Sequence, residues 1–466
     1  MIDLSFLKGK SIAVMGLGAS GLAAARALIK GGVSVLAWDD NAEARRYARD
    51  SEIPLSDLNT ADFDAIDALV LAPGIPHTHP AAHPVAACAK AAGTEIIGDI
   101  ELLRRADPDR PLIAITGTNG KSTTTALLGD IIEADQPVLL GGNLGPPVLA
   151  FSPPANDGAV FVLEVSSYQM ELSPSLRPDI AVLLNITPDH LERHGGMDGY
   201  IAAKRRIFAQ QPHTGVIGVD DTICTRIAAD LEAAGGTAVI RVSVTQALDE
   251  GVFVRDGILI DALGDTPEAV ADLREARALP GAHNWQNAAA AYAAARAHGL
   301  SRATIAGKLL AFDGLPHRQQ DLGDIAGVRF VNDSKATNAE AAARALTCYE
   351  DIYWIAGGRP KESGLSGIEP ALPRIRQAFL IGEAQRPFAT WLQGHGVGAR
   401  RCSTLPAATR AAFETARAAR DSGDAATPVV LLSPACASFD QFPNFAARGE
   451  AFREEVHEMR ELEGRR

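Results

Sequence analysis

A glycine-rich segment between residues 113 and 125 constrains the fold of this chain more than any other feature. It reads Ile-Ala-Ile-Thr-Gly-Thr-Asn-Gly-Lys-Ser-Thr-Thr-Thr. An apolar, β-type stretch ends at Thr116, and Lys121 and Ser122 open a segment with helical periodicity. A strand, a glycine turn and a helix in this order are typical of a phosphate-binding loop. The segment therefore predicts an α/β protein that binds a nucleoside triphosphate.

The residue types in this loop suit phosphate chemistry. Gly117 and Gly120 let backbone N–H groups point at phosphate oxygens, and Lys121 supplies a positive charge. The Ser122 hydroxyl can ligate Mg²⁺. The loop has the short form G-x-x-G-K-S, because Ile115 stands where the longer pattern has its first glycine. The alternative is a glycine-rich connection that binds nothing; the lysine and serine at the helix start favour nucleotide binding.

Composition sets limits on the class of protein. With 466 residues the chain is expected to form about three domains of roughly 150 residues each. Its net charge of -13 is spread along the sequence, so neither nucleic acid nor an anionic membrane is an expected partner. No signal segment and no apolar run of about 18 residues is found, which predicts a cytoplasmic protein. The cysteines form no C-x-x-C pair and predict free thiols, most of them buried: Cys88, Cys224, Cys348, Cys402 and Cys436.

A second glycine-rich turn lies near the N-terminus. An apolar run over 11–15 precedes Gly16-Leu-Gly18-Ala-Ser-Gly21, a helical segment follows over 22–30, and a strand over 33–38 ends at Asp39. This is the dinucleotide-binding pattern. Its chemistry is less specific, because glycines at a helix start bind any pyrophosphate and Asp39 can accept from a sugar or a base. NAD, FAD, another nucleotide diphosphate and a turn without a ligand all stay open at this point.

The end of the first domain is marked by a strand, a turn and a linker. The strand over 68–71 ends in Ala-Pro-Gly-Ile-Pro at 72–76, at the edge of a parallel sheet where ligands bind. A polar, proline-bearing linker over 106–111 predicts a domain boundary after residue 109. Three histidines in between lack the spacing of metal ligands and are expected in a surface loop: His77, His79 and His83.

In the second domain, polar residues follow successive strands. The strand over 159–163 ends in Glu164, and a carboxylate beside a phosphate loop is what hydrated Mg²⁺ needs. The strand over 180–184 runs on to His190, which favours a second metal site over an ordinary loop histidine. Lys204, in a helical segment, is by default a solvated helix lysine.

The rest of the chain predicts helices and then a third sheet. After 216–220 the pattern loosens into β-type pieces and turns up to 278, and helices follow up to residues 297 and 312, with a boundary after 314. Strands over 328–331, 351–356, 379–381 and 429–432 alternate with helices and end in polar residues, which predicts a third parallel sheet. Cys436 is expected to be a buried thiol and not a nucleophile.

Taken together, the motifs resemble the Mur ligases of peptidoglycan synthesis over essentially the whole chain. They are Thr116–Thr123, Glu164 with Ser166-Ser167, Asn185–His190, His283-Asn284, His317-Arg318, Asn332–Asn338 and Ser433–Ser438. The last two, with Asp440-Gln-Phe442, resemble the branch of the family that adds D-glutamate. The resemblance implies a Rossmann-like N-terminal domain over 1–109, a P-loop-type mononucleotide-binding α/β domain over 110–314, and a Rossmann-like C-terminal domain over 315–466.

The resemblance also implies a role for individual residues. The UDP-linked substrate is assigned to Gly16, Leu17, Gly18, Asp39 and Asn143. ATP is assigned to Gly117, Thr118, Asn119, Gly120, Lys121, Ser122, Thr123, Asn284, Arg318, Asp333 and Lys335. Metal is assigned to Ser122, Glu164, His190 and Lys204, and the catalytic residues to Lys121, His190 and Lys204. D-Glutamate is assigned to Thr337, Lys361, Ser438, Phe439 and Phe445.

The activity implied is ATP-dependent addition of D-glutamate to UDP-N-acetylmuramoyl-L-alanine through an acyl phosphate, in cell wall synthesis. It would require ATP, Mg²⁺ at two sites and a carbamylated Lys204, in a monomer that binds small molecules only. Two other classes of protein stay open: a regulatory protein that hydrolyses ATP without an amino acid, and an NAD-linked enzyme with an accessory ATPase domain.

Overall fold

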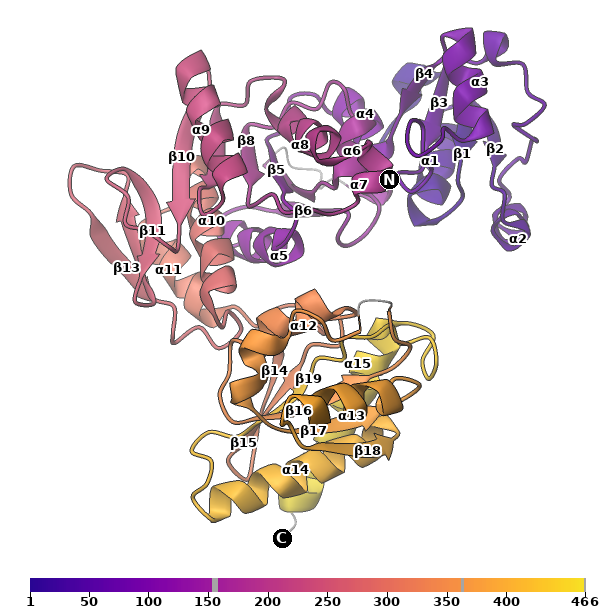
Figure 1. Cartoon of the computed structure of the whole chain (residues 1–466). Helices are drawn as coiled ribbons and strands as arrows, with labels where there is room; N and C mark the ends of the chain where they lie inside the picture. The colour runs from indigo at the N-terminus through magenta and orange to yellow at the C-terminus, as the bar shows by residue number, and fades with distance from the viewer. Residues whose placement is uncertain (153–157, 362–363, 465–466) are drawn as a thin grey trace. The chain divides into compact units, whose positions relative to one another are not determined.

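The computed structural model describes residues 1–152, 158–361 and 364–464, and these form three sheets flanked by helices (Figure 1). The chain divides into two compact units. The first unit is Met1–Leu273 with Asn284–Leu310, and the second is Arg274–His283 with Ala311–Arg466. The α/β class with three sheets is as predicted, whereas the boundaries at 109 and 314 stay predictions. Among the described residues, no helix is long and apolar enough to cross a membrane.

The N-terminal sheet has four parallel strands in the order β2-β1-β3-β4. The strands are β1 (Ser11–Met15), β2 (Ser34–Trp38), β3 (Ala68–Leu71) and β4 (Glu95–Ile97). The helices are α1 (Ala19–Lys30), α2 (Ala42–Asp50), α3 (Pro84–Ala92) and α4 (Asp99–Ala106). The chain leaves β1 toward β2 on one side and returns to β3 on the other. The loops after β1 and β3 therefore flank a topological switch point, where parallel sheets bind ligands.

Two helices of this domain, α2 and α3, are absent from the sequence prediction. The Asn41 side chain caps α2 by accepting from the N–H groups of Glu43 and Ala44. Pro84 occupies the first turn of α3, and the His83 ring accepts from Val85 N–H. His83 also contacts the Asp40 carboxylate, with Nε2 and Oδ2 2.8 Å apart. The expectation of histidines in a plain surface loop was therefore wrong for His83, since cap chemistry and a carboxylate hold its ring.

The central sheet has nine strands in the order β13-β12-β11-β10-β9-β8-β5-β7-β6. They are β5 (Leu112–Thr116), β6 (Val138–Gly142), β7 (Val160–Glu164), β8 (Ile180–Leu183), β9 (Thr214–Gly218), β10 (Ala238–Ser243), β11 (Gly251–Arg255), β12 (Ile258–Ala262) and β13 (Glu268–Asp272). Pairing is parallel from β6 to β11 and antiparallel from β11 to β13. The phosphate-loop strand β5 lies between β7 and β8, so three strand ends meet beside the loop.

Helices of the central domain are α5 (Lys121–Ile132), α6 (Ser167–Glu171), α7 (Leu191–His194), α8 (Met197–Arg205), α9 (Thr222–Ala234), α10 (Ala282–His298) and α11 (Arg302–Ala311). The expectation of β-type pieces and turns alone over 216–278 was wrong for α9. Asp221 caps this helix by accepting from Cys224 N–H at 2.8 Å. Cys224, Ile227 and Ala228 form its buried face at helical spacing. A short buried face flanked by alanines gives a weak periodic signal.

The C-terminal sheet has six strands in the order β14-β15-β19-β16-β17-β18. They are β14 (Gln320–Ile325), β15 (Val328–Asn332), β16 (Ile352–Gly357), β17 (Ile375–Ile381), β18 (Ala399–Ser403) and β19 (Val429–Leu432), and the helices are α12 (Ala339–Leu346), α13 (Gln385–Gly394), α14 (Leu405–Asp421) and α15 (Phe445–Gly464). The prediction of a wholly parallel sheet was wrong at one edge, where β14 pairs antiparallel with β15. Ala326 and Gly327 both have positive φ and form the tight turn between these strands.

Both faces of the C-terminal sheet are buried, as the strand β16 illustrates. Ile352 and Trp354 belong to the core that includes α12 and α13, whereas Tyr353 and Ile355 belong to the core that includes α14 and α15. All six residues of β16 are buried. A strand covered on both faces reads as a continuous apolar run, which is why it was predicted correctly. Short 3-10 helices lie at Ser5–Leu7, Phe63–Ala65, Val148–Ala150, Arg206–Phe208 and Glu369–Arg374.

The five cysteines are free thiols, as predicted. Cys224 and Cys436 are buried, Cys348 and Cys402 are half-buried, and Cys88 is exposed. The expectation that most are buried was therefore wrong, because Cys348 and Cys402 pack against a core only from its rim and stay partly exposed. Burial raises the pKa of the Cys436 thiol to about 12, which keeps it protonated and unreactive. Cys436 is a buried structural thiol, as expected.

Candidate active site

The phosphate loop of the sequence prediction is present after β5, which lies between β7 and β8 of the second sheet. Strand β5 ends at Thr116, helix α5 begins at Lys121, and Gly120 caps the helix with a φ of 87°. A Cβ atom on Gly120 would lie 2.1 Å from Asn287 Oδ1 of α10. The left-handed backbone and this close approach both require glycine. Asn287 in turn donates to Asn284 Oδ1 at 3.2 Å, so the predicted ATP residue Asn284 lies one side chain from the loop.

Hydrogen bonds from the neighbouring strand end hold the loop in shape. The Asn185 side chain, after β8, donates to Asn119 O at 3.1 Å and accepts from Asn119 N–H at 2.9 Å. Lys121 Nζ donates to Gly117 O at 2.9 Å and to Thr118 O at 2.8 Å. The ammonium group therefore lies over the loop that the sequence assigns to phosphate. A loop fixed in this way is preorganised for an anion.

Glu164 ends β7 as predicted, and its carboxylate is 1% exposed. One oxygen, Oε1, accepts from Asn143 Nδ2 at 2.9 Å. The other, Oε2, is buried without a hydrogen-bond partner among the described residues. A buried carboxylate oxygen without a partner is costly unless a cation or a donor reaches it. The side chain therefore fits a metal ligand, and the neighbouring buried Ser122 hydroxyl at the start of α5 fits as well.

Protein side chains alone do not assemble a complete metal site. Among the described residues, no group of three or more His, Cys, Asp or Glu side chains is placed to hold one ion. Mg²⁺ commonly binds through one or two carboxylates and takes its other ligands from phosphate and water. The arrangement fits a cation that arrives with a nucleotide.

Lys204 is placed differently from its default assignment as a solvated helix lysine, which was wrong. Its side chain is 1% exposed, and Nζ donates to Gly117 O of the phosphate loop at 2.7 Å. Burial first, and the charge of Lys121 second, lower the pKa of Lys204 to about 7. The reason is packing: α8 turns this residue inward, with Nζ 4.7 Å from the centre of the Tyr200 ring. Lys204 is thus a buried amine beside the predicted phosphate site.

His190 lies at the start of α7 with a φ of 52°, and about half of its side chain is exposed. Its Nε2 is 3.4 Å from Asp189 Oδ2, and its ring centre is 5.1 Å from that of Tyr168. The exposed half of the ring belongs to a cavity wall. His190 is therefore available to a ligand, and its role in metal binding stays a prediction.

A cavity of about 540 Å³ opens at the ends of the strands of the first unit. The central domain contributes Lys121, Asn143, Ser167, Asp189, His190 and Lys204, among others. The N-terminal domain contributes Ala19 and Ser20 after β1, Pro73 and Gly74 after β3, and Asp99. The cavity is therefore continuous from the predicted phosphate loop to the switch point of the first sheet.

The residues predicted to bind UDP fall into two groups. Asn143 lines the cavity, whereas Gly16, Leu17, Gly18 and Asp39 are not part of its wall. Asp39 Oδ2 accepts from Leu17 N–H at 2.6 Å, and Oδ1 accepts from Asn41 N–H. The carboxylate thus holds the glycine turn in place. Its assignment to the nucleotide, with that of the turn, stays a prediction.

The second unit contains the remaining predicted ATP residues. Asp333, after β15, is buried and accepts from the Ser433 hydroxyl at 2.8 Å and from Gln319 N–H at 3.2 Å. Burial raises the pKa of Asp333 to about 7, although both hydrogen bonds act in the opposite sense. Lys335 Nζ lies 3.9 Å from the centre of the Phe445 ring. Arg318 is half-buried before β14.

The residues predicted to bind D-glutamate follow three adjacent strands of the C-terminal sheet. Thr337 follows β15, Lys361 follows β16, and Ser438 and Phe439 follow β19. Their exposure differs: Ser438 is buried, Thr337 and Phe445 are half-buried, Lys361 is exposed, and Phe439 is 64% exposed. The carboxyl ends of the strands bring the set to one edge of the sheet. Contact with D-glutamate stays a prediction.

Arg448, which the sequence prediction omits, ties two of these loops together. It is 1% exposed and donates to Ser334 O at 2.9 Å and to Cys436 O at 3.1 Å. Burial lowers the pKa of this guanidinium to about 10. Nothing in the local sequence distinguishes an arginine inside a polar helix from a solvated one.

Other cavity residues were missed as well. Ser167 and Asp189 stand within the motifs of the sequence analysis but received no role there, and Tyr168 follows directly, so proximity to Glu164 and His190 could have indicated them. Asp99 had no such signal. It begins α4, and burial raises the pKa of its carboxyl to about 6.

Comparison with known proteins identifies the class of protein that this fold and cavity define: the chain belongs to the Mur ligase family. Residues 115–295 match the Mur ligase middle domain, and residues 10–98 match the Mur ligase MurD-like, N-terminal domain. The resemblance stated from the sequence motifs is confirmed.

Two relatives that are similar over nearly their full length are named for the same reaction. The chain is 51% identical over 468 residues to the UDP-N-acetylmuramoylalanine–D-glutamate ligase of Phenylobacterium zucineum, with 98% of each chain covered. It is 52% identical to the ligase of the same name from Rhodospirillum rubrum, covering 98% of this chain and 97% of that one.

Solved structures support the fold. A UDP-N-acetylmuramate-alanine ligase of Thermotoga maritima superposes with a TM-score of 0.57 at 18% identity, covering 96% of this chain and 99% of that chain. A MurF ligase of the same organism gives a TM-score of 0.56 at 16% identity, with 98% and 97% covered. At these identities the likeness concerns the fold, and it confirms the predicted three-domain α/β architecture.

Proposed function

We propose that this chain is an ATP-dependent ligase that adds D-glutamate to UDP-N-acetylmuramoyl-L-alanine in peptidoglycan synthesis. The observation that carries the proposal is identity of about half of all residues, over nearly the full length, to ligases named for this reaction. The cavity between the phosphate loop and the switch point of the first sheet fits a nucleotide-linked acceptor. The alternatives of an NAD-linked enzyme and a regulatory ATPase lack such support.

The reaction needs an activated carboxylate. A carboxylate is a poor acyl donor, so the alanyl carboxylate first attacks the γ-phosphorus of ATP, and ADP leaves. The amine of D-glutamate then attacks the acyl phosphate carbon, a C–N bond forms, the C–O bond to phosphate breaks, and inorganic phosphate leaves. The amine loses its proton on the way. Most of the catalysis is positioning and charge stabilisation, since two anionic substrates must be held together.

Residues of this chain supply the positive charge and the donors. Lys121 lies over the phosphate loop and is placed to meet ATP phosphates, with N–H groups of the loop beside it. His190 faces the cavity and is assigned to the alanyl carboxylate and the metal. Arg318, Asp333 and Lys335 are assigned to ATP from the second unit. Repulsion between the anions is offset mainly by the positive charges of Lys121, Arg318 and Lys335.

Mg²⁺ fits the first unit, because Glu164 Oε2 is buried and has no hydrogen-bond partner in the described part of the chain. We assign one ion to Ser122 and Glu164, and a second to Glu164, His190 and Lys204. The bound cations would neutralise charge on the phosphates and on the acyl phosphate oxygens.

Lys204 would join the metal ligands as a carbamate. A lysine amine attacks CO2 only when it is unprotonated, and the lowered pKa of about 7 keeps much of Lys204 in that form. The carbamate is an anion with two oxygens, which explains how a lysine could lie beside Mg²⁺. Incubation with ¹³C-labelled bicarbonate should give a carbamate resonance in the wild type and none in Lys204→Met. Equal spectra for both would contradict the assignment.

We place the reaction in the cytoplasm, where ATP is available, and expect a monomer that binds no nucleic acid and no membrane. Sedimentation equilibrium tests the oligomeric state. A mass twice that of the chain would contradict it.

Phosphate release tests the function directly. The assay contains ATP, Mg²⁺ and UDP-N-acetylmuramoyl-L-alanine, with D-glutamate, L-glutamate or neither. We expect release that requires both the UDP-linked acceptor and D-glutamate. Release that is indifferent to the amino acid would overturn the proposal in favour of a plain ATPase, and the N-terminal glycine turn would then be tested against dinucleotides.

A further inference from the structure

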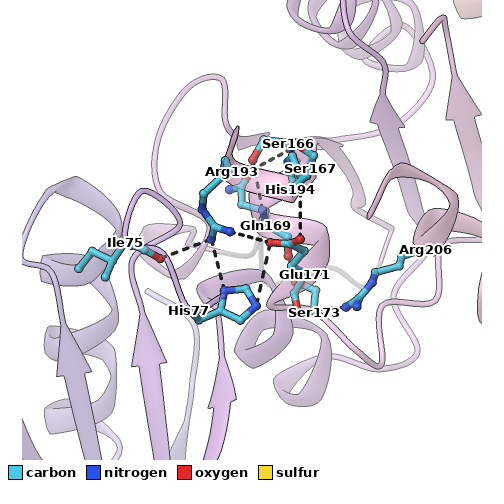
Figure 2. A network of polar contacts seen from close by, with 10 residues as sticks. All are labelled: Ile75, His77, Ser166, Ser167, Gln169, Glu171, Ser173, Arg193, His194 and Arg206. Atoms are coloured by element: carbon cyan, nitrogen blue, oxygen red, sulfur yellow. Dashed lines mark hydrogen bonds and ion pairs between the residues drawn. The ribbon is translucent and has the colours of Figure 1, made fainter. Parts of the chain in front are cut away.

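A buried polar network joins helix α6 to helix α7 and to the N-terminal domain (Figure 2). Its centre is Glu171, the last residue of α6, whose side chain is 13% exposed. Oε1 is 3.0 Å from His194 Nδ1, and Oε2 accepts from Arg193 Nη1 at 3.2 Å. Arg193 reaches on to His77 Nδ1 at 3.3 Å. The network thus spans both domains of the first unit, and the activity outlined above uses none of these side chains.

One end of the network reaches the wall of the cavity. His194 has no exposed side-chain surface, and its Nε2 is 2.9 Å from Ser167 Oγ. Ser167 is buried and belongs to the cavity lining. The His194 ring also packs against the rings of Tyr168 and Tyr200, with centres 5.5 and 5.3 Å away. These contacts fix the ring, so the direction of its hydrogen bond to Ser167 is fixed as well.

Hydrogen-bond chemistry determines which atom donates at each contact. The Glu171 carboxylate, paired with Arg193, can only accept, so His194 Nδ1 carries the hydrogen. Burial lowers the pKa of His194, which keeps the imidazole neutral at pH 7. In a neutral imidazole with a hydrogen on Nδ1, Nε2 is an acceptor. The Ser167 hydroxyl therefore donates to His194, and its oxygen lone pairs are left for the cavity.

We propose that Ser167 is a specificity-determining residue that accepts a hydrogen bond from an N–H or O–H group of the UDP-linked substrate, and that His194 and Glu171 position it. The inference rests on the proposed function for the identity of that substrate. UDP-N-acetylmuramoyl-L-alanine has such donors in its two amides and its sugar hydroxyls. Phosphate and carboxylate oxygens cannot donate, so the group that Ser167 recognises is an amide or a hydroxyl group of the substrate.

The same three side chains could be read as a nucleophilic triad, since serine, histidine and a carboxylate stand in hydrogen-bonded order. Ligation through an acyl phosphate needs no serine nucleophile. A fluorophosphonate probe separates the two readings: we expect no labelling of the wild type. Labelling that is lost in Ser167→Ala would make Ser167 a nucleophile and would overturn the proposal.

The main test compares two buried serines close together in the sequence. Ser167→Ala removes the acceptor, whereas the control Ser173→Ala removes a hydroxyl that donates to Gln169 O and belongs to a residue outside the cavity lining. We expect Ser167→Ala to raise KM for the UDP-linked substrate about tenfold. The KM values for ATP and D-glutamate should stay close to those of Ser173→Ala. An unchanged KM for the UDP-linked substrate, or an equal rise for all three substrates, would overturn the proposal.

A double-mutant cycle tests the positioning role. His194→Phe keeps a ring in the site but removes the acceptor, so the Ser167 hydroxyl loses its fixed direction; we expect KM for the UDP-linked substrate to rise about threefold. The double variant with Ser167→Ala and His194→Phe should have the same KM for the UDP-linked substrate as Ser167→Ala alone, because His194 acts only through the Ser167 hydroxyl. His194→Gln, whose amide can both donate and accept, should recover part of the loss. Additive effects would overturn the role of His194. The activity of the wild type with D-glutamate is measured in parallel. If the wild type is active with D-glutamate and the variants do not behave as expected, the proposal for Ser167 is wrong but the proposed function is not.

Discussion

The two units of the chain each bury a carboxylate at the carboxyl end of a strand, but the two carboxylates differ in their hydrogen bonds. Glu164, at the end of β7, has one oxygen bonded to Asn143 and one without a partner among the described residues. Asp333, after β15, has both oxygens bonded, one to the Ser433 hydroxyl and one to Gln319 N–H. The first carboxylate keeps the capacity to bind a ligand, whereas the second already stabilises its own loops.

The same difference extends to the basic residues. Lys204 of the first unit lies against the phosphate loop with a pKa lowered to about 7, beside a cavity. Arg448 of the second unit uses its donors to hold the backbone of two loops. The first unit thus places buried charge beside the cavity. The second unit uses buried charge to hold loops that also carry exposed side chains, such as Lys361. Substitutions in the two units should therefore affect different quantities.

The largest effect is expected for Glu164→Gln. Glutamine keeps the shape and can still accept from Asn143, but it removes the charge that binds the cation. We expect kcat to fall about 10³-fold with little change in stability. The matched control is Glu101→Gln. Glu101 is also fully buried, but its carboxylate accepts hydrogen bonds from Ser175 and Arg105 and does not line the cavity. Steady-state kinetics of both variants test this prediction. A similar kcat in the two variants would show that Glu164 has no special role in cation binding.

Lys204→Met should lower kcat about 10²-fold and also stabilise the protein. The lysine binds its proton with a pKa of about 7 in the native state, below its value of 10.5 in the unfolded chain. Between these values the unfolded state binds more protons, so wild-type stability rises with pH. Lys204→Met has no buried amine to deprotonate, so its free energy of unfolding should exceed that of the wild type by roughly 2–4 kcal/mol at pH 7. The difference should vanish near pH 10.

Urea unfolding in CO2-free buffer measures this difference, because carbamylation would alter the charge of the wild-type residue. A variant less stable than the wild type at pH 7 would show that burial of the Lys204 amine does not lower the free energy of unfolding.

Asp333→Asn should change the pH dependence of stability. The native pKa of about 7 lies above the unfolded value of 3.8, so the native state binds the proton of Asp333 more tightly. The resulting contribution to the free energy of unfolding is full below about pH 4 and is lost as pH rises through 7. Asparagine keeps the size of the side chain and can still bond to Ser433 and Gln319. We expect the variant to match the wild type below about pH 4 and to be roughly 2–4 kcal/mol more stable at pH 8. Equal stability at both pH values, in urea unfolding, would argue against a neutral Asp333.

Lys361→Ala should have the smallest effect on stability. Its side chain is exposed, so the free energy of unfolding is expected to change by no more than about 0.5 kcal/mol. KM for D-glutamate should nevertheless rise, because a charge opposite a carboxylate is lost. Lys8→Ala, at another exposed lysine, is the control and should change neither quantity. An unchanged KM for D-glutamate would remove Lys361 from that site.

Much of the fold could be predicted because it is recorded in local patterns. Strands such as β5 and β16 are buried on both faces and read as short apolar runs, and glycines mark the turns that follow β1 and β5. The elements that were missed are those whose pattern is weak or mixed. Helix α9 has a narrow buried face, and strand β14 is an edge strand with alternating polar residues.

The sequence by itself determined the phosphate loop, the order of strands with polar ends and the family, because these depend on residues that are neighbours along the chain. Only the tertiary structure decided that Lys204 is buried against Gly117, that Arg448 joins two loops, and that Ser167, His194 and Glu171 form one network. Burial and hydrogen-bond direction depend on which helix faces turn inward. That choice is made by packing between distant segments, so the charge state of a lysine or the tautomer of a histidine cannot be inferred from its neighbours in sequence.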